Sequence, residues 1–323
     1  MPLPVCSDVE FIRLWDDLKS ATLVANALGI TPRAVSQRRR RLEQMHKTRL
    51  HSSDPRGDRY YAHAETRQHP ARHVLSIRNG TIVCFSDAHF WPGVRTTAYR
   101  GLLKVIRDLK PYAVINNGDA FDGASISRHP RIGWDSKPTV QDEVRACIDR
   151  LGEVQEAAGD AKLLWPLGNH DARFETFLAA NVPQFQGVQG FTLRDKFPDW
   201  VPCWSVFVND DVVIKHRYKS GIHATHNNTM WAGRTMVTGH LHSLKVTPLD
   251  DYNGTRWGVD TGTLADPHGP QFEDYLETNP TNWRSGFVVL TWRDGRLMWP
   301  EIARVWDANT VEFRGALIDV SQE

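Results

Sequence analysis

The sequence predicts an α/β protein with a small all-helical domain at its N-terminus. Several short apolar runs recur between residues 80 and 240, and helical patterns separate the first three of them. The first 45 residues differ, because their apolar positions follow helical spacing throughout. We therefore expect a helical module at 1–45, a polar linker at 46–73 and a larger α/β domain at 74–323.

Composition and charge limit the class of protein. With 323 residues and 41% hydrophobic content, the chain is long enough for a sizeable core. It has no apolar stretch of transmembrane length and no signal-peptide core at its start, so we expect a cytoplasmic protein that does not bind membranes. The four cysteines are widely spaced and indicate reduced thiols. Lys and Arg outnumber Asp and Glu by 14 to 8 in residues 1–80, whereas acids outnumber bases by 30 to 25 afterwards.

Three helices are expected in the N-terminal module. Ser20 can cap the second helix, Gly29 can end it, and Thr31 and Pro32 can begin the third. The spacing of Ala25, Gly29 and Val35 resembles the helix-turn-helix of DNA-binding proteins, in which a small residue allows close helix crossing.

The third helix would present basic and amide side chains to nucleic acid, with DNA a better candidate than RNA. The candidate contact residues are Arg33, Gln37, Arg38, Arg40 and Arg41. The alternative is a three-helix bundle whose basic face only keeps it soluble or binds a protein. Residues 46–73 contain histidines that we interpret as solvated linker residues. These are His46, His51, His63, His69 and His73.

The larger domain begins with a pattern of strand, helix, strand. Helices at about Arg95–Leu109 and Thr139–Ala157 separate the first three strands, so parallel pairing through right-handed crossovers is expected. Two long segments, 181–211 and 265–285, are rich in aromatic residues. They could stack on nucleotides or pack against the sheet.

Each of five apolar runs ends in side chains that bind hard or borderline metals, without cysteine. Because parallel strands present their carboxyl ends at one edge of a sheet, these side chains are expected to converge. The candidates are Asp87, His89, Asp119, Asp122, Asn169, His170, Asp171, His216, His240 and His242.

The motifs Asp-x-His, Gly-Asp-x-x-Asp, Gly-Asn-His-Asp, a single His and Gly-His-x-His, in this order, resemble the signature of the calcineurin-like metallophosphoesterases. The resemblance covers about residues 80–265. It implies a two-sheet sandwich flanked by helices, with the second sheet built from strands near Val212, Met236, 286–292 and 296–299. It also implies two divalent metals, for which we expect manganese, although iron, zinc and nickel suit the same ligands.

The resemblance also implies a role for each residue. One metal would be held by Asp87, His89, Asp119 and His242. The other would be held by Asp119, Asn169, His216 and His240, so that Asp119 bridges the two metals. His226 is the alternative to His216 as the lone histidine.

His170 would contact the scissile phosphate and protonate the leaving oxygen. Asp122, favoured by the family pattern, or Asp171 would orient the His170 ring. Asp171 could instead cap the helix that follows it.

The leading functional prediction is a two-metal phosphodiesterase that cleaves nucleic acid with a metal-bridging hydroxide. Phosphoprotein phosphatases of the superfamily have Arg-Gly after the second aspartate, whereas this chain has Gly123-Ala124. Gly-Asn-His-Asp is shared with DNA-repair nucleases and phosphodiesterases, and the chain also resembles exonuclease-like members encoded by phages and prophages. The alternatives are a phosphomonoesterase, a cyclic-nucleotide phosphodiesterase, and a DNA-binding regulator with a non-catalytic phosphoesterase scaffold.

Overall fold

The computed structural model describes residues 5–46, 50, 69–128, 137–276 and 279–323. The chain divides into two compact units, residues 1–68 and 69–323, which are described separately below. In the described part of the chain, no helix is both long enough and apolar enough to cross a membrane.

The N-terminal unit contains the three expected helices, α1 (Asp8–Leu18), α2 (Ala21–Leu28) and α3 (Pro32–His46). The side chain of Ser20 caps α2, and Gly29 ends it in a left-handed conformation. The Thr31 hydroxyl accepts a hydrogen bond from the Ala34 amide at 3.2 Å, which caps α3. The three helices share a small core, which consists of Phe11, Trp15, Val24, Ala25, Val35, Leu42 and Leu50.

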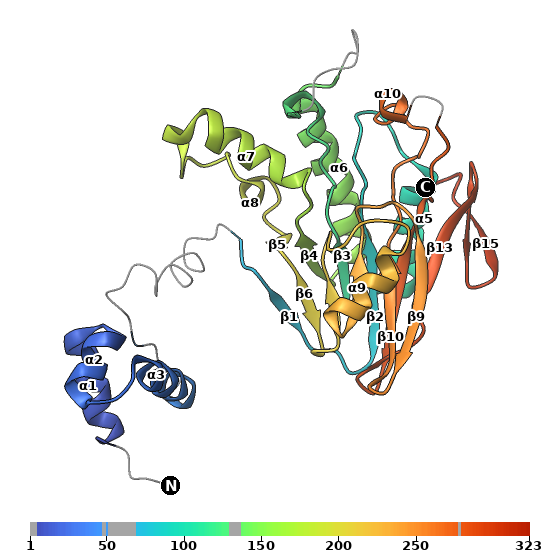
Figure 1. Ribbon diagram of the computed structural model, residues 1–323. Coiled ribbons are helices and arrows are strands. Elements are labelled where there is room, and N and C mark those ends of the chain that lie inside the picture. The colour runs from blue at the N-terminus through green and yellow to red at the C-terminus, as the bar shows by residue number, and fades with distance from the viewer. Residues whose placement is uncertain (1–4, 47–49, 51–68, 129–136, 277–278) are drawn as a thin grey trace. The chain divides into compact units, whose positions relative to one another are not determined.

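The larger unit is built around two sheets (Figure 1). The first sheet has nine strands, with the order β15-β14-β13-β11-β2-β3-β4-β5 and β12 paired to β11. Its strands are β2 (Gly80–Phe85), β3 (Ala113–Asn116), β4 (Lys162–Pro166), β5 (Val201–Cys203), β11 (Gly286–Arg293), β12 (Arg296–Leu297), β13 (Glu301–Asp307), β14 (Thr310–Phe313) and β15 (Ala316–Asp319). Strands β2 to β5 are parallel, and β11 to β15 join them antiparallel.

The second sheet has six strands in the order β1-β6-β7-β8-β10-β9. These are β1 (His73–Leu75), β6 (Val206–Val208), β7 (Val212–Ile214), β8 (Thr235–Thr238), β9 (Lys245–Asp251) and β10 (Gly254–Asp260). Helix α9 (Ala224–Ala232) packs on β8, β9 and β10. Shorter elements in the connections are η1 (Ala124–Ile126), α7 (Asp171–Asn181), η2 (Pro183–Phe185), α8 (Leu193–Lys196) and α10 (Glu273–Leu276).

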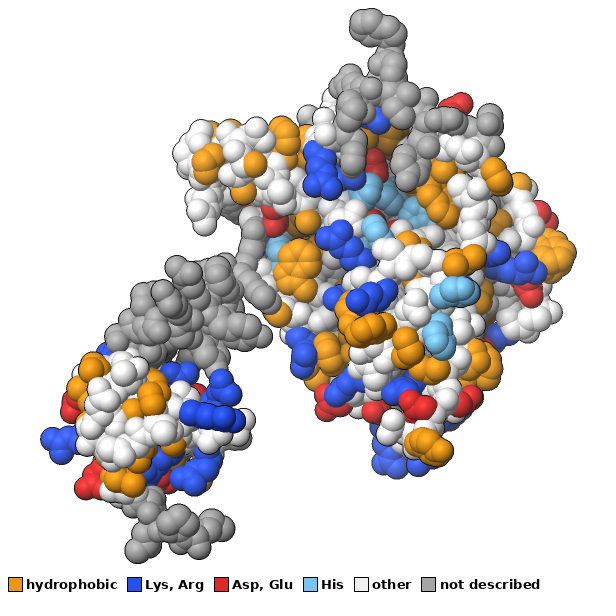
Figure 2. Space-filling model, viewed as in Figure 1, with side chains coloured by type: hydrophobic (Ala, Val, Ile, Leu, Met, Phe, Trp, Pro, Cys, Tyr) orange, Lys and Arg blue, Asp and Glu red, His pale blue; other side chains and the backbone are white. Residues whose placement is uncertain are grey.

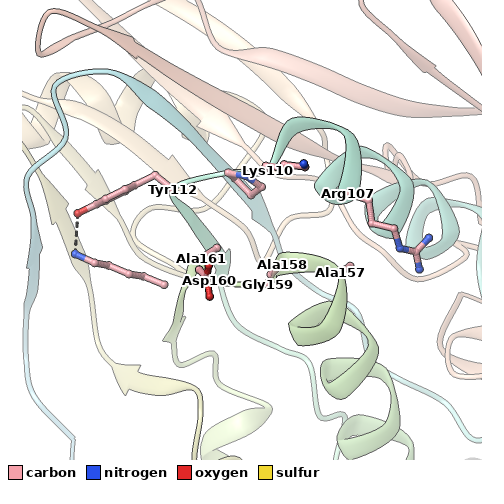
Figure 3. A pocket seen from close by; sticks show the side chains of 10 residues that line it. Arg107, Lys110, Tyr112, Ala157, Ala158, Gly159, Asp160 and Ala161 are labelled. Carbon is pink, nitrogen blue, oxygen red and sulfur yellow. Dashed lines mark hydrogen bonds between the residues drawn. The ribbon is translucent and has the colours of Figure 1, made fainter.

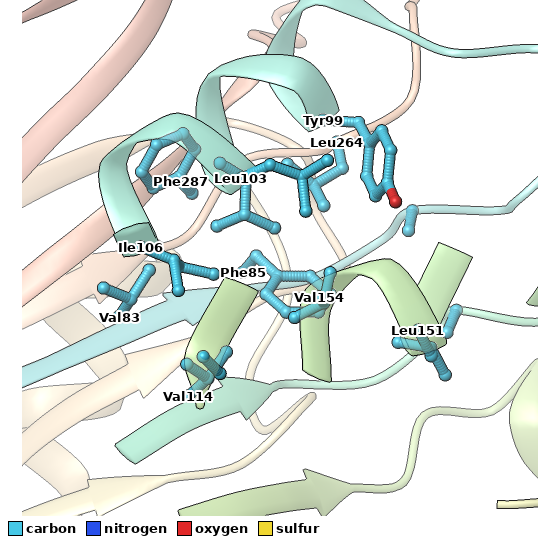
Figure 4. Packing of buried hydrophobic residues seen from close by; sticks show 14 of the residues in the cluster. Val83, Phe85, Tyr99, Leu103, Ile106, Val114, Leu151, Val154, Leu264 and Phe287 are labelled. Atoms are coloured by element: carbon cyan, nitrogen blue, oxygen red, sulfur yellow. The ribbon is translucent and has the colours of Figure 1, made fainter. Parts of the chain in front are cut away.

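Alternation along the strands explains why both faces of the first sheet are buried. On β2, Val83 and Phe85 join the core beneath helices α5 (Thr97–Leu109) and α6 (Val140–Ala158), as Figure 4 shows. The intervening Ile82 and Cys84 belong to the core between the two sheets. Successive side chains on a strand point to opposite faces, so a continuous apolar run fits a strand covered on both sides. The expected sandwich flanked by helices is confirmed.

One expectation about the second sheet is wrong. The strands at 286–293 and 296–297 belong to the first sheet, because β11 pairs antiparallel with β2 through the register Val288 to Cys84. The strands near Val212 and Met236 do lie in the second sheet, as expected.

The interpretation of His69 as a solvated linker residue is also wrong. His69 is buried, and its Nε2 lies 3.0 Å from Glu175 Oε2 on α7. His73 begins β1, whereas His46 is exposed at the end of α3. The predictions for His51 and His63 concern residues outside the described ranges.

Candidate metal centre

The predicted metal ligands directly follow the ends of five strands. Three of these strands belong to the first sheet and two belong to the second. The first-sheet strands β2, β3 and β4 run parallel, so the residues that follow them meet at one edge. Strands β7 and β8 of the second sheet are also parallel to each other. The residues that follow these five strands are Asp87 and His89, Asp119 and Asp122, Asn169 and His170, His216, and His240 and His242.

These side chains form clusters with the spacing that metal ions need. One cluster contains Asp87, His89 and His242, and another contains Asp119, His216 and His240. In each cluster, the potential ligand atoms lie within 4.8 Å of one another. For each predicted metal, three of the four predicted ligands therefore lie together in one of these two clusters. The alternative ligand His226 lies on α9 and belongs to neither cluster.

Hydrogen bonds fix which ring nitrogen two of the histidines, His89 and His216, direct at the clusters. His89 Nδ1 lies 2.8 Å from Asp122 Oδ1, and His216 Nδ1 donates to the Asn117 carbonyl at 2.8 Å. Both partners accept hydrogen bonds, so both rings carry a proton on Nδ1 and direct Nε2 into the clusters. Carboxylates and carbonyls orient metal-binding histidines in this way.

Several buried polar atoms in the clusters fit a bound metal. Among the described residues, His89 Nε2, Asn169 Oδ1 and His242 Nδ1 are buried and have no hydrogen-bond partner. Leaving such atoms unsatisfied costs roughly 1–3 kcal/mol each, so native proteins rarely do so. Nitrogen and oxygen donors of this kind bind divalent first-row metals. The residues present therefore fit the two-metal centre implied by the sequence.

The backbone at the centre is held in a conformation that ordinary residues seldom adopt. Five of the predicted ligands have φ between 39° and 72°, namely Asp87, His89, Asp119, His240 and His242. A left-handed residue other than glycine costs on the order of 1–3 kcal/mol, and such strain concentrates at functional sites. Tertiary contacts must offset that energetic cost, so that the loops hold the ligand side chains directed at the clusters.

Glycines allow the ligand loops to approach one another closely. A Cβ on Gly168 would overlap the Asp119 side chain and backbone, and a Cβ on Gly239 would lie 2.6 Å from Asp87 Oδ2. A Cβ on Gly118 would lie 2.5 Å from Nδ1 of the His216 ring. Each glycine directly precedes a predicted ligand, so these motif glycines keep space for the neighbouring ligand loop.

Gly168→Ala is expected to disrupt the centre, whereas Gly152→Ala is expected to be tolerated. Neither glycine has a φ in the left-handed region, so space is what separates them. A Cβ at Gly152, inside α6, meets nothing within 4 Å, and the substitution should stabilise that helix by roughly 0.5–1 kcal/mol. Overpacking at Gly168 should destabilise the fold by roughly 1–3 kcal/mol and weaken metal binding. Thermal unfolding and metal content of both variants test this, and equal behaviour would contradict it.

His170 lies beside the clusters and is held by Asp122. Its Nδ1 lies 2.9 Å from Asp122 Oδ1 and 3.0 Å from the Asp122 carbonyl oxygen. Its Nε2 lies 4.0 Å from Asp119 Oδ2. Burial lowers the pKa of His170, but the Asp119 and Asp122 carboxylates outweigh it and raise the pKa above its ordinary value. The two carboxylates thus position the ring and favour its protonated form, which a proton donor requires.

Asp171 has a structural task that differs from both earlier suggestions. Its carboxylate is fully buried and accepts hydrogen bonds from the backbone of the motif loops and from Trp165. The donors are the amides of Asp119, Ala120, Phe121 and Gly168 and the indole Nε1 of Trp165. Burial, followed by the Asp119 charge, raises the pKa of Asp171 to about 6. Asp171 therefore connects the loop after β3 to the loop after β4 through hydrogen bonds.

Arg173, on the first turn of α7, was missed by the sequence analysis. Its guanidinium donates to the Asp122 carbonyl at 2.9 Å and lies 3.2 Å from His170 Nε2. Its place three residues after His170 was a usable signal, because residues three apart share a helix face.

Glu143 and two aromatic residues were missed as well. The buried Glu143 carboxylate accepts hydrogen bonds from the Gly123 and Ala124 amides and so fixes the loop after Asp122. The rings of Phe272 and Trp283 lie 5.7 and 4.4 Å from the His242 ring. Phe272 is mostly buried, so packing accounts for part of the aromatic segment at 265–285.

Metal binding is expected to release protons and to strengthen as pH rises. Burial lowers the pKa of His216, but Asp119 and Asp87 outweigh it and raise the pKa to about 10 in the metal-free protein. The ring must lose a proton to bind a metal, so each released proton should raise the affinity about tenfold per pH unit below that pKa. Calorimetry of manganese binding in buffers of different ionisation enthalpy measures this release. An affinity independent of pH would exclude His216 as a ligand.

A cavity of about 590 Å³ lies elsewhere, between the α5–β3 and α6–β4 connections (Figure 3). It adjoins the amino ends of β3 and β4, opposite the edge that carries the clusters. Its lining includes Lys162, which donates to the Tyr112 hydroxyl at 2.7 Å. Since its lining holds none of the cluster residues, the metal centre remains the candidate catalytic site.

In the N-terminal unit, the predicted nucleic-acid contacts do not share one environment. Arg33, Gln37 and Arg40 are exposed, and Arg41 is exposed although it also contacts Asp8. Arg38, by contrast, is only 12% exposed and donates to Asp8 Oδ1 at 2.7 Å and to the Cys6 carbonyl. Arg38 therefore joins α3 to the start of α1, which leaves Arg33, Gln37 and Arg40 for a partner.

A protein-family model matches this chain, whereas comparison with curated proteins finds no match. The model of the calcineurin-like phosphoesterase family matches residues 80–278, which is more than half of the chain and includes the predicted ligands. This family consists of metal-dependent hydrolases that act on phosphate esters. The chain therefore belongs to the calcineurin-like phosphoesterases.

Proposed function

We propose that this enzyme is a two-metal phosphodiesterase that cleaves nucleic acid. The observation that carries the proposal is the meeting of two metal-binding clusters with the His170–Asp122 pair at one edge of the sandwich. One metal would be held by Asp87, His89, Asp119 and His242, and the other by Asp119, Asn169, His216 and His240. Manganese is the proposed metal, as the family implies, although the same nitrogen and oxygen donors also suit iron, zinc and nickel.

The bound metals would supply the Lewis acidity that ionises an attacking water and neutralises the phosphate oxygens. The chain's own residues supply the remaining steps. His170 donates a proton from Nε2 to the leaving oxygen once the Arg173 guanidinium, which lies at that nitrogen and can only donate, turns to the phosphate. Asp122 holds the ring through Nδ1. Arg173 lies next to His170 Nε2, where its guanidinium can bind a non-bridging phosphate oxygen.

The loop after Asp122 favours a diester over a monoester. Gly123 has a φ of 66°, and a Cβ there would lie 2.9 Å from the Phe121 ring. The Glu143 carboxylate also holds its amide at 2.8 Å. This loop therefore does not accommodate an arginine like that of the phosphoprotein phosphatases. A monoester dianion would lack that cation, whereas a diester carries one negative charge and needs less neutralisation.

The exposed face of α3 supports nucleic acid as the substrate. Arg33, Gln37 and Arg40 are spaced by four and three residues, so they form one stripe along the helix. A cationic stripe on a third helix suits contact with phosphates and with base edges in a major groove. Tethered to the enzyme, such a module raises the local concentration of DNA at the metal centre.

The double variant Arg33→Ala/Arg40→Ala is expected to weaken cleavage of duplex DNA through a higher KM, with kcat retained. Each lost phosphate contact should lower the salt slope of binding by about 0.9. Arg13→Ala, an exposed arginine on α1, is the matched control and should behave as wild type. Unchanged KM and salt slope in the double variant would remove the recruitment idea and leave the diesterase assignment untouched.

The substrate class is tested by comparing bis(p-nitrophenyl) phosphate with p-nitrophenyl phosphate, with manganese and with chelator. We expect metal-dependent turnover with a higher kcat/KM for the diester. In a second assay, we expect the enzyme to cleave labelled DNA. A higher kcat/KM for the monoester would assign the enzyme to the phosphatases. Rapid turnover of cyclic nucleotides with none of DNA would assign it to the cyclic-nucleotide phosphodiesterases.

A further inference from the structure

A group of cations and aromatic rings lies around the end of β7, where the chain reaches the predicted ligand His216. It includes residues that precede β1 and residues that lie in or follow α9. We call it the basic-aromatic surface and define it by Arg72, Lys215, Tyr218, Lys219, Trp231 and Arg234. Three of these residues lie within three positions of the predicted ligand His216. Figure 2 shows Lys and Arg side chains near the histidines on this face of the larger unit.

The rings and cations are interleaved. Lys219 Nζ lies 5.4 Å from the centre of the Tyr218 ring and 4.9 Å from that of the Trp231 ring. Lys215 Nζ lies 5.5 Å from the Tyr218 ring on the other side of the turn. Tyr218 is 44% exposed and Trp231 is 66% exposed, so both rings remain available to a ligand.

The turn that carries these residues is fixed to the fold. The Lys219 amide donates to the side-chain oxygen of Asn228 at 2.8 Å, and Asn228 is buried within α9. The positions of Tyr218 and Lys219 relative to Trp231 are thus set by α9. A surface arranged in this way costs little entropy to order when it binds a ligand.

A second part of the surface is a cavity of about 350 Å³, which Lys215 and Tyr218 also line. The Arg72 guanidinium lies 3.7 Å from the Phe207 ring centre, and Arg234 lies 6.0 Å from the same ring. Asp210 is the one carboxylate among the lining residues, against three cations. Residues 81–323 as a whole carry more acids than bases, so this concentration of positive charge is local.

We propose that the basic-aromatic surface binds single-stranded nucleic acid and guides the strand to the metal centre. The inference rests on the proposed function and concerns the unpaired strand that enters the metal centre, while α3 would contact duplex DNA. Every base has a face that stacks on an aromatic ring, and the phosphates between bases pair with cations such as Lys215 and Lys219. A duplex hides its base faces inside the helix, so exposed rings between cations favour a single strand.

The test compares two aromatic and cationic pairs. Lys219→Ala/Trp231→Ala removes the pair at the surface, and Arg304→Ala/Trp306→Ala removes a matched pair on β13. In the control pair, the Arg304 guanidinium lies 5.3 Å from the centre of the Trp306 ring, and Trp306 is 55% exposed. Fluorescence anisotropy measures the binding of a labelled oligothymidylate to full-length protein in the presence of chelator. An oligonucleotide of about 12 nucleotides is long enough for one single-strand binding site. Thermal unfolding checks that each variant is folded.

We expect the Lys219→Ala/Trp231→Ala variant to raise the Kd for oligothymidylate by about tenfold or more, as loss of base stacking implies. Its salt slope should fall by about 0.7 for the lost phosphate contact. The control variant should match wild type in both. Equal Kd values for the two variants would overturn the inference. So would displacement of the oligonucleotide by polyglutamate of equal charge, which would assign the surface to an acidic protein partner.

Failure of the proposed function gives a different result. If wild type hydrolyses neither bis(p-nitrophenyl) phosphate nor DNA with manganese, the diesterase proposal is wrong. The anisotropy measurement in chelator does not depend on that outcome, because it reports binding alone.

Discussion

Asp119→Asn is expected to reduce phosphodiester hydrolysis by on the order of 10³-fold or more. Asp119 is buried, and its Oδ2 lies 3.0 Å from His216 Nε2 while its Oδ1 accepts the His170 amide at 2.8 Å. The proposed bridge between the metals needs two anionic oxygens. An amide keeps the shape but removes the charge and one acceptor, so both metals should bind more weakly.

Two measurements test this effect: the initial rate of hydrolysis with manganese present, and the metal content of the protein after dialysis. The variant should still bind duplex DNA, because α3 belongs to a separate unit. Asp108→Asn, a half-exposed aspartate on α5, is the matched control and should keep full activity. A rate within about tenfold of wild type would show that Asp119 does not bridge two metals.

His170→Ala is expected to have an effect that depends on the leaving group. A general acid contributes about 10²- to 10⁴-fold, and most of that is needed when the leaving oxygen is basic. We therefore expect a large loss of kcat for a nucleotide ester, whose leaving alkoxide must be protonated. The loss should be much smaller for bis(p-nitrophenyl) phosphate, because p-nitrophenolate leaves without a proton.

His226→Ala is the matched control, since His226 lies on α9 outside both clusters. It should leave both rates unchanged. Equal losses for the two substrates in His170→Ala would show that His170 binds or positions the phosphate without donating a proton.

Local patterns explain which parts of this molecule the sequence predicted. The ligand motifs follow apolar runs directly, so each strand end and the ligands that follow it are adjacent in sequence. The caps of α2 and α3 are also local, because Ser20 and Thr31 bond amides only three residues away. Helices α5 and α6 differ from their expected bounds by two residues or fewer at each end.

Features that depend on distant residues were missed. β11 is apolar enough for either sheet, and its partner β2 lies about 200 positions earlier, so nothing near Val288 indicates the choice. His69 looks like a polar linker residue until Glu175 on α7 is brought beside it. The basic-aromatic surface likewise joins Arg72 to Trp231 only after folding.

The environment of Arg38 could have been predicted and was not. Val35 and Leu42 form the buried face of α3, and positions three and four after Val35 lie on that face. Arg38 and Arg39 occupy them, and their guanidiniums lie 4.9 and 4.8 Å from the rings of Phe11 and Trp15. Helical periodicity separates these two arginines from the exposed stripe of Arg33, Gln37 and Arg40.

The most direct test of the proposed centre is a titration of metal-free protein with manganese, in which bis(p-nitrophenyl) phosphate hydrolysis is followed. The two clusters that share one edge predict that the rate rises to a maximum at two equivalents of metal per chain. Asp119→Asn should show no such rise. A maximum at one equivalent, or no hydrolysis at any manganese concentration, would contradict the two-metal phosphodiesterase.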